Sequence, residues 1–230
     1  MQMKKEIMEQ IRNGVIVSCQ ARKGWPMYGK EIMAAFANAA AAGGAVGIRA
    51  TEPENIAAIK REVKLPMIGI YKQWFEGYDV YITPTFASCE AIIAAGAEII
   101  ALDGTKRPRP NGEKLADIIT KVHEKYPEII VMADCDSVES GIYAANCGAD
   151  LVSTTLAGYT EETKEKTVFD ADLIREMSEK IAVPIIAEGH IASVADLKAA
   201  YQAGAYSVVI GTAITRPEVI TKKFVTSLEN

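Results

Sequence analysis

The sequence is poor in the residues that build metal sites and disulfide frameworks. It holds 4 cysteines and 2 histidines in 230 residues, and no two cysteines stand in a Cys-X-X-Cys arrangement. A structural zinc site needs about four such ligands at close spacing, and disulfide frameworks are typical of much shorter chains. We therefore expect four ordinary thiols, at Cys19, Cys89, Cys135 and Cys147.

Long apolar runs and an excess of positive charge are also missing. No stretch reaches the roughly 18 uncharged apolar residues that a membrane span needs. Charged and apolar side chains are mixed over residues 1–13, which predicts an amphipathic helix and not a signal peptide. The formal net charge is −5, whereas a nucleic-acid-binding scaffold needs a basic face. We expect a cytoplasmic protein without nucleic-acid or membrane partners, although a few local cations could still hold a small anion.

An internal repeat gives the chain its organisation. A Gly-Ala step followed by a short β-type run occurs four times, with the alanines at positions 45, 97, 149 and 205, so that the spacings are 52, 52 and 56 residues. A βα unit with its loops takes about 25 residues, so each spacing holds two units. Glycine suits the end of a helix because it accepts a positive φ. The repeat predicts eight strands in all.

Helical patterns alternate with eight short apolar runs, which are typical of parallel strands buried on both faces. The expected strands lie in 14–18, 44–48, 66–71, 96–100, 127–133, 148–152, 184–187 and 204–208. The expected helices are 29–42, 54–63, 88–95, 113–125, 138–146, 171–180, 194–203 and 218–228. This alternation predicts a single (β/α)8 TIM barrel over residues 1–230, with an extra N-terminal helix. A doubly wound open sheet is the alternative, but no Gly-X-Gly-X-X-Gly turn follows the first strand.

Polar side chains stand where the strands of a barrel end, which is where barrel active sites lie. In chain order, the C-terminal ends carry Gln20, Arg49, Lys72, Asp103, Asp134, Thr154, Glu188 and Gly211-Thr212. One polar residue at such a point can simply mark where a strand reaches water. A whole set converging on one rim predicts an active site.

Lys72 and Glu188 are the candidates for proton transfer. Desolvation among bulky neighbours, together with the nearby cation Arg49, would lower the pKa of Lys72 from about 10.4 toward the range of a general base. Such an amine could instead form a Schiff base with a carbonyl substrate. Glu188 ends an apolar strand, which favours a raised pKa. The third and seventh strands of an eight-strand ring are opposite, so we expect the two side chains to face each other.

A phosphate site is expected at the loops after the seventh and eighth strands. Gly189, Gly211 and Thr212 offer backbone N–H groups there, and Arg216 follows as a cation that can bind phosphate oxygens. The alternative is a turn glycine followed by a capping threonine.

We expect the other carboxylates and the histidine near the rim to bind substrate or to stabilise the local structure. Asp136 or Ser137 is expected to cap the helix that follows, and we expect no catalytic metal at Asp134 and Asp136. Asp134 is expected to accept a substrate hydroxyl instead. His190 is expected to stabilise its loop by a hydrogen bond, with a catalytic role as the alternative.

Taken together, these residues resemble the N-acetylmannosamine-6-phosphate 2-epimerase family over nearly the whole chain. The segments that carry the resemblance are Ser18-Cys19-Gln20-Ala21, Gly47-Ile48-Arg49-Ala50, Ile68-Gly69-Ile70-Tyr71-Lys72, Ala101-Leu102-Asp103-Gly104-Thr105 with Arg107-Pro108, Met132-Ala133-Asp134-Cys135-Asp136, Thr155-Leu156-Ala157-Gly158-Tyr159-Thr160, Ala187-Glu188-Gly189 and Ile210-Gly211-Thr212-Ala213-Ile214-Thr215-Arg216-Pro217. Each segment is short, and their joint order and spacing make the resemblance specific.

The resemblance implies a barrel that interconverts N-acetylmannosamine 6-phosphate and N-acetylglucosamine 6-phosphate in sialic-acid catabolism. It implies Lys72 as the main acid/base and Glu188 as its partner. It also implies that the enzyme needs no cofactor, that homodimers are common, and that some members exchange the last helix. The remaining residues it assigns are the substrate-orienting Gln20, Arg49 and Asp134 and the phosphate-binding Arg216.

Two rival functions stay open. The first is a Schiff-base aldolase for phosphosugars that uses Lys72. The second is a phosphosugar sensor without catalysis, which would need the phosphate site but no facing acid and base such as Lys72 and Glu188.

Overall fold

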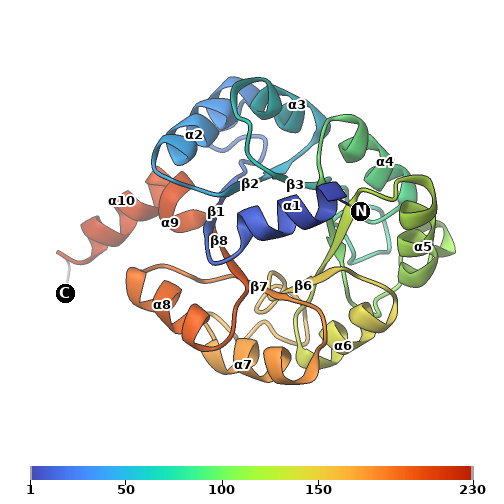
Figure 1. The fold of residues 1–230 in the computed structure, drawn as a ribbon. Helices are drawn as coiled ribbons and strands as arrows, with labels where there is room; N and C mark the ends of the chain where they lie inside the picture. Colours follow the sequence, from blue (N-terminus) through green and yellow to red (C-terminus); the bar gives the residue numbers. More distant parts are fainter. Residues whose placement is uncertain (1, 229–230) are drawn as a thin grey trace.

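The short apolar runs form eight parallel strands that close into a barrel (Figure 1). Each strand pairs with the next one in the chain, and the last pairs with the first. The structure is a computed structural model that describes residues 2–228; residues 1, 229 and 230 of the expected domain lie outside the described residues. The strands are β1 (Val15–Cys19), β2 (Gly47–Thr51), β3 (Met67–Ile70), β4 (Ile99–Asp103), β5 (Ile130–Asp134), β6 (Leu151–Ser153), β7 (Ile185–Glu188) and β8 (Ser207–Ile210). The predicted TIM barrel is confirmed.

Helices alternate with the strands and surround them. The expected N-terminal helix is present, and the other expected helices occur with ends that differ by at most two residues. A four-residue helix near the C-terminus was not expected, because one turn is too short to show a helical period. The helices are α1 (Gln2–Ile11), α2 (Lys30–Ala42), α3 (Pro53–Glu62), α4 (Phe86–Ala94), α5 (Leu115–Lys125), α6 (Val138–Asn146), α7 (Ala171–Lys180), α8 (Val194–Gln202), α9 (Thr212–Thr215) and α10 (Pro217–Thr226), with a 3-10 turn at Pro110–Gly112.

The repeated Gly-Ala steps form the turns that end four helices. The glycines at 44, 96, 148 and 204 have φ values of 92°, 106°, 97° and 100°. In each turn the alanine N–H donates to the carbonyl five residues earlier, as from Ala45 to Ala40 at 3.0 Å. This is the Schellman motif, whose left-handed position glycine occupies at the lowest cost. The strands therefore begin three residues after each glycine, later than the sequence predicted.

The strand expected at 127–133 also begins later, at Ile130. Tyr126 accepts a hydrogen bond from the Ile129 N–H at 3.0 Å, so Pro127 and Glu128 lie in a turn. Proline lacks the N–H that a strand inside a sheet needs for its ladder.

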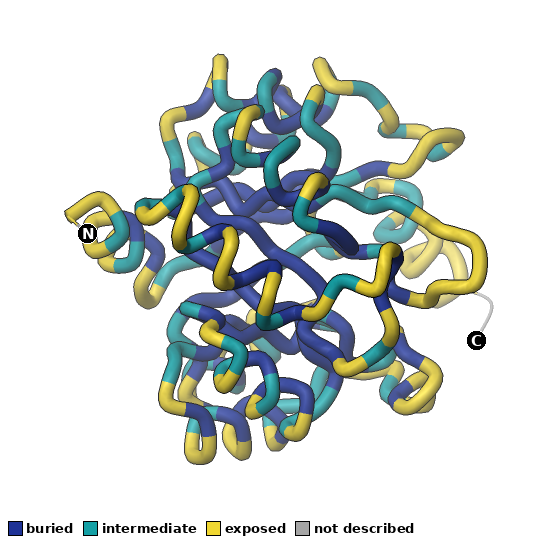
Figure 2. Tube along the Cα trace, turned by 90° about the vertical axis from the view of Figure 1, so that its right-hand side faces the viewer, coloured by how far each residue is buried: buried dark blue, intermediate teal, exposed yellow. Residues whose placement is uncertain are grey.

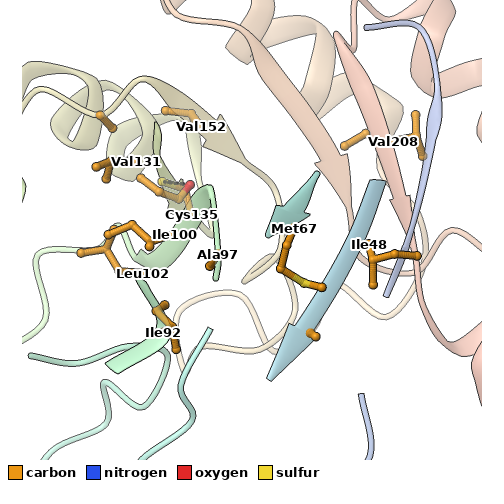
Figure 3. Close-up of a cluster of buried hydrophobic side chains, with 14 of the residues drawn as sticks. Ile48, Met67, Ile92, Ala97, Ile100, Leu102, Val131, Cys135, Val152 and Val208 are labelled. Carbon is orange, nitrogen blue, oxygen red and sulfur yellow. Dashed lines mark hydrogen bonds between the residues drawn. The ribbon is translucent and has the colours of Figure 1, made fainter. Parts of the chain in front are cut away.

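Two apolar layers hold the barrel together. One fills its interior, where Ile7 and Ile11 of α1 pack with inward side chains of the strands, so that α1 crosses one end of the barrel (Figure 1). The other lies between the strands and the surrounding helices, where Ile92 of α4 belongs to the same cluster as Ile100 and Met67 (Figure 3). Buried backbone runs through the middle of the molecule, and exposed positions lie on the outer sides of helices and on loops (Figure 2).

The C-terminal helix α10 differs from the other helices. It projects beyond the outline of the barrel (Figure 1), and none of its described residues is buried. Phe224, Val225 and Leu228 at this end of the chain are 71%, 52% and 88% exposed. Within residues 2–228, no helix has the length and apolar character needed to cross a membrane.

Candidate active site

A cavity of about 1280 Å³ opens at the C-terminal ends of the strands, away from α1. It brings together side chains from strands that are far apart in the sequence. Of the nine residues predicted for the site, eight line this cavity: Gln20, Arg49, Lys72, Glu188, Gly189, Gly211, Thr212 and Arg216. The ninth, Asp134, lies beneath the cavity floor with none of its surface exposed.

Arg49 and Asp134 form a buried ion pair across the barrel. Arg49 is 1% exposed, and its two terminal nitrogens donate to the two Asp134 oxygens at 3.1 and 2.6 Å. Ser153 and Thr155 donate further hydrogen bonds to Asp134 Oδ1, at 2.8 and 2.9 Å. Burial alone would lower the pKa of Arg49, but the charges of Asp134 and Glu188 raise it overall. The guanidinium is therefore a permanent, fixed cation on the cavity floor.

Glu188 stands at the end of β7 and shares the same cation. Its Oε2 lies 2.9 Å from Arg49 Nη1 and accepts a hydrogen bond from the Thr155 hydroxyl at 3.0 Å. The backbone of Glu188 is held by Thr154, whose hydroxyl donates to its carbonyl at 2.8 Å and accepts from its N–H at 3.0 Å. Burial raises the pKa of Glu188 to about 7, although Arg49 acts in the opposite direction. Near neutral pH this carboxyl can either hold or release a proton.

Lys72 follows β3 and is held by a short antiparallel pairing with the segment before α4. Lys72 bridges Ile82, and the Gln73 N–H donates to the Tyr81 carbonyl at 2.9 Å. Burial, followed by the positive charges of Arg49 and Arg22, lowers the pKa of Lys72 to about 8. A lowered pKa caused by burial and Arg49 was predicted from the sequence, and the contribution of Arg22 was not. A substantial fraction of the amine is therefore neutral near physiological pH and able to accept a proton.

Besides Nε2 of His190, two buried polar atoms of cavity-lining residues have no hydrogen-bond partner among residues 2–228. They are Oε1 of Gln20 and Nε of Arg49. The amide nitrogen of Gln20 donates to the Ser18 hydroxyl at 2.8 Å, which leaves its oxygen directed elsewhere. An unpaired buried polar group costs about 1–3 kcal/mol, and a ligand that pairs with it recovers part of that cost. Both atoms therefore indicate a binding site for a polar ligand.

The expected phosphate-binding residues meet at one side of the cavity. Gly211 caps α9, whose first residues Thr212 and Ala213 also line the cavity. The Thr215 hydroxyl donates to the Ser18 carbonyl at 2.8 Å and so ties α9 to the end of β1. Arg216 pairs with Glu218 at 2.7 Å, and its guanidinium lies 3.8 Å from the centre of the Trp25 ring. Backbone N–H groups and a cation at one place are a general anion-binding arrangement.

Several residues at the site were not predicted. Ser153 and Thr155 hold the two carboxylates, and Arg22, Trp25 and Tyr81 line the cavity. Small hydroxyl side chains give no separate signal in a sequence. The position of Thr155, two residues after the sixth strand, is the one feature that could have identified it.

Two strand-end residues have roles other than those expected. Asp103 does not line the cavity; it accepts hydrogen bonds from Thr105 and pairs with Arg107 at 2.5 Å. His190 lines the cavity but stabilises its loop by stacking on Tyr159, with the ring centres 5.2 Å apart and the planes at 4°. The expected hydrogen bond of His190 is not seen at Nε2, which is buried without a partner in the described part of the chain.

Metal-ligating side chains are scattered. Within residues 2–228, no three His, Cys, Asp or Glu side chains are grouped so that they could hold a metal ion.

Comparison with known proteins assigns the chain to a family. The model of the family described as "Putative N-acetylmannosamine-6-phosphate epimerase" matches residues 33–230. The chain belongs to this family. A relative from Caldanaerobacter subterraneus, named "Putative N-acetylmannosamine-6-phosphate 2-epimerase", is 48% identical over 227 residues, which cover 99% of this chain and 96% of the relative. A relative of the same name from Clostridium perfringens is 43% identical over 95% of this chain and 98% of its own.

Solved structures agree with the family assignment. The N-acetylmannosamine-6-phosphate 2-epimerase from Clostridium perfringens superposes with a TM-score of 0.93 at 42% identity, covering 96% of this chain and 95% of its own. Thiamine phosphate pyrophosphorylase from Pyrococcus furiosus, with a TM-score of 0.61 at 15% identity, shares the fold alone.

Proposed function

We propose that the protein is an isomerase that interconverts N-acetylmannosamine 6-phosphate and N-acetylglucosamine 6-phosphate. The observation that carries this proposal is a lysine with a lowered pKa and a glutamate with a raised pKa, in one cavity, with Arg49 close to both. The family and its named relatives supply the substrate. The protein would act in sialic acid (N-acetylneuraminate) and amino-sugar catabolism in the cytoplasm, as one domain spanning residues 1–230.

Inversion at C2 needs removal of a proton beside the C1 carbonyl of the ring-opened sugar. Lys72, neutral in part at pH 7–8, takes this proton, and the Arg49 guanidinium stabilises the negative charge that develops on the carbonyl oxygen. Donors fixed in this way contribute about 3–4 kcal/mol each in comparable sites. Arg49 is already held rigidly by Asp134, so no reorganisation is needed when the charge forms.

The proton must then return to the opposite face of C2. Glu188, on the strand across the ring from β3, can donate it because its pKa of about 7 leaves much of the carboxyl protonated at neutral pH. Alternatively, Lys72 returns the proton itself after the intermediate has turned in the site.

The remaining predicted residues hold the substrate. Gln20 directs its unpartnered oxygen to a substrate N–H or hydroxyl. The N–H groups at Gly189, Gly211 and Thr212 and the Arg216 guanidinium bind the phosphate. Asp134 was predicted to bind substrate directly; its four hydrogen bonds to Arg49, Ser153 and Thr155 favour a positioning role through Arg49.

We also propose that the reaction needs no cofactor and that the protein is a homodimer. The base, the acid and the oxyanion donor are all side chains of this chain. The exposed apolar side chains near the C-terminus, at Phe224, Val225 and Leu228, support a second copy as the partner that covers them.

The decisive experiment is incubation of the protein with N-acetylmannosamine 6-phosphate in D2O, followed at C2 by NMR. We expect the second epimer to form with deuterium at C2, and we expect Lys72→Ala to abolish both signals. Absence of the second epimer with the wild-type protein would refute the proposal.

The same preparation tests the two rival functions. A Schiff-base aldolase would give a covalent adduct at Lys72 after borohydride reduction, whereas an epimerase gives turnover without one. A sensor would bind the phosphosugar and leave C2 unchanged.

A further inference from the structure

Arg22, which no sequence pattern singled out, lies between two aromatic rings at the rim of the cavity. Its guanidinium carbon is 5.5 Å from the centre of the Trp25 ring and 5.7 Å from the centre of the Trp74 ring. Trp74 in turn stacks on Tyr81, with centres 5.7 Å apart and planes at 4°. Arg22 therefore joins the loop after β1 to the segment after β3.

Apart from its contacts with the two rings, the guanidinium of Arg22 has no partner among residues 2–228. Arg22 is exposed and lines the cavity, and within residues 2–228 its side chain forms neither an ion pair nor a hydrogen bond. Its positive charge acts on Lys72, Tyr81 and Tyr159, whose pKa values all respond to it. These three residues come from different sides of the rim, so the charge lies near the open mouth of the cavity and not on the outer surface.

The loop that carries Arg22 has a defined shape. The Trp25 N–H donates to the Arg22 carbonyl at 2.9 Å, and the Tyr28 N–H donates to the Trp25 carbonyl at 3.1 Å. Gly24 has a φ of 89°, the value that the third residue of a type II turn requires. Trp25 is half-buried and packs against the apolar layer under the helices. The backbone of Arg22 is therefore held by the turn that follows it, although its side chain is exposed.

Trp25 contacts two cations at once. Arg216 lies 3.8 Å from its ring centre and Arg22 lies 5.5 Å from it, and both arginines line the cavity. Two guanidinium groups on one indole repel each other, and Glu218 pairs with Arg216 alone. Cation–π contacts contribute about 0.5–2 kcal/mol each and hold the pair in place, but they do not remove the repulsion. An anion bound in the cavity that both groups line would offset it.

We propose that Arg22 and Arg216 form a two-guanidinium clamp for the phosphate dianion of the substrate, with Trp25 as the support for both. The clamp rests on the function proposed above, which supplies a phosphosugar as substrate. The N–H groups at Gly211 and Thr212 bind the phosphate from the side of α9, and the clamp binds it from the side of the β1–α2 loop. Guanidinium groups bind phosphate in a bidentate manner, so two of them favour the dianion over an uncharged sugar hydroxyl.

The sequence contains 2 tryptophans, Trp25 and Trp74, and Arg22 contacts both. Tryptophan emission therefore reports on this rim and on no other part of the molecule. Titration with inorganic phosphate, at constant ionic strength, measures binding without any catalytic step.

We expect Arg22→Gln to raise the Kd for inorganic phosphate by about tenfold, the factor that corresponds to about 1.4 kcal/mol. We expect the same variant to raise KM for N-acetylmannosamine 6-phosphate while KM for the unphosphorylated sugar stays unchanged. Lys23→Gln is the matched control, because it removes the same charge from the next residue of the loop, which is exposed and does not line the cavity. We expect it to bind phosphate like the wild type.

Three results would overturn the clamp. One is an unchanged Kd in Arg22→Gln, and the second is an equal loss in Lys23→Gln, which would show only the general charge of the loop. The third is a wild-type protein that turns over the phosphosugar but whose emission does not respond to phosphate. Failure of the wild type to epimerise would instead refute the proposed function, and the phosphate titration would still test the clamp.

Discussion

Two parallel hydrogen bonds join Arg49 to Asp134, although the residues are 85 positions apart in the chain. They lie on β2 and β5, which are not neighbours in the sheet, so the pair crosses the interior of the barrel. A third strand joins through Glu188, 2.9 Å from the same guanidinium. The cation that we propose stabilises the developing negative charge is therefore also a cross-link between three strands.

Removal of Asp134 should destabilise the fold as well as the site. Asp134→Ala leaves Arg49 buried with one carboxylate, and breaking a buried pair in this way costs about 3–5 kcal/mol. We expect a lower unfolding midpoint in urea, with the slope of the transition unchanged. The reason is that the buried guanidinium loses two hydrogen bonds and one of the two carboxylates that compensate its charge.

The double variant Arg49→Met with Asp134→Leu is the control for this interpretation. Replacing both charges with apolar groups removes the desolvation cost, so part of the lost stability should return while activity stays absent. If Asp134→Ala unfolds at the wild-type midpoint, the ion pair does not contribute to stability as we argue.

An isosteric substitution tests the role of Glu188 separately from the roles of its neighbours. Glu188→Gln keeps the size of the side chain and removes its ability to transfer a proton. We expect kcat to fall by about 10²–10⁴, with KM changed much less, because the phosphate-binding groups are untouched. Steady-state kinetics at pH 7 measure both constants.

Deuterium exchange in the same variant assigns the role of Glu188. If Glu188 returns the proton on the second face, exchange into the starting epimer persists while the other epimer no longer forms. If Lys72 acts on both faces, exchange and epimerisation keep the same ratio as in the wild type. A kcat equal to that of the wild type would exclude any proton-transfer role for Glu188.

The positions of the rim residues followed from the sequence because a polar residue interrupts or follows each apolar run, although Arg49 lies in the middle of β2 and not after its end. Arg49, Lys72 and Glu188 were identified in this way, and all three line the cavity. The four Gly-Ala turns set the spacing of the strands. The alternation of strands with helices and the residue types of the turns depend on a few neighbouring positions, so a short stretch of sequence predicts them.

Register and cross-barrel contacts could not be read in the same way. At the end of β6 the prediction selected Thr154, but the hydroxyls that reach the carboxylates belong to Ser153 and Thr155. Side chains alternate between the two faces of a strand, so this choice needs the register of the whole barrel. The burial of Asp134 and the pairing of Arg22 with two tryptophans depend on residues from other loops, which no local pattern reveals.

The exposed C-terminal helix leads to a prediction about assembly. Phe224 is 71% exposed in the single chain, so Phe224→Glu should leave the fold intact. If a second copy covers this face, the buried charge should dissociate the dimer. We expect sedimentation equilibrium to shift from dimer to monomer.

Lys222→Glu is the control on the same helix, because residues two positions apart point to nearly opposite sides. We expect this variant to remain dimeric. A wild-type protein that is monomeric at micromolar concentration would contradict the proposed homodimer.

The charge of Arg22 should also be visible in the pH dependence of the reaction. Burial and the cations Arg49 and Arg22 lower the pKa of Lys72 to about 8, while Glu188 and Asp134 act in the opposite direction. A base works in its neutral form, so the second-order rate constant of deuterium exchange into the starting epimer, which needs Lys72 and not the Glu188 proton, should rise with pH and reach half its maximum near 8. Removing a positive neighbour makes the protonated amine more stable. In Arg22→Gln the midpoint should therefore move to higher pH.

The position of this midpoint is independent of the strength of phosphate binding. Weaker binding lowers the rate constant by the same factor at every pH in this range. The second pKa of a phosphate monoester is about 6 and lies below the range of interest. Arg22→Lys keeps the charge and should keep the midpoint near 8, even though it loses the planar guanidinium. An unshifted midpoint in Arg22→Gln would mean that Arg22 does not influence the base, and a wild-type rate that falls instead of rising through this pH range would mean that Lys72 acts in its protonated form.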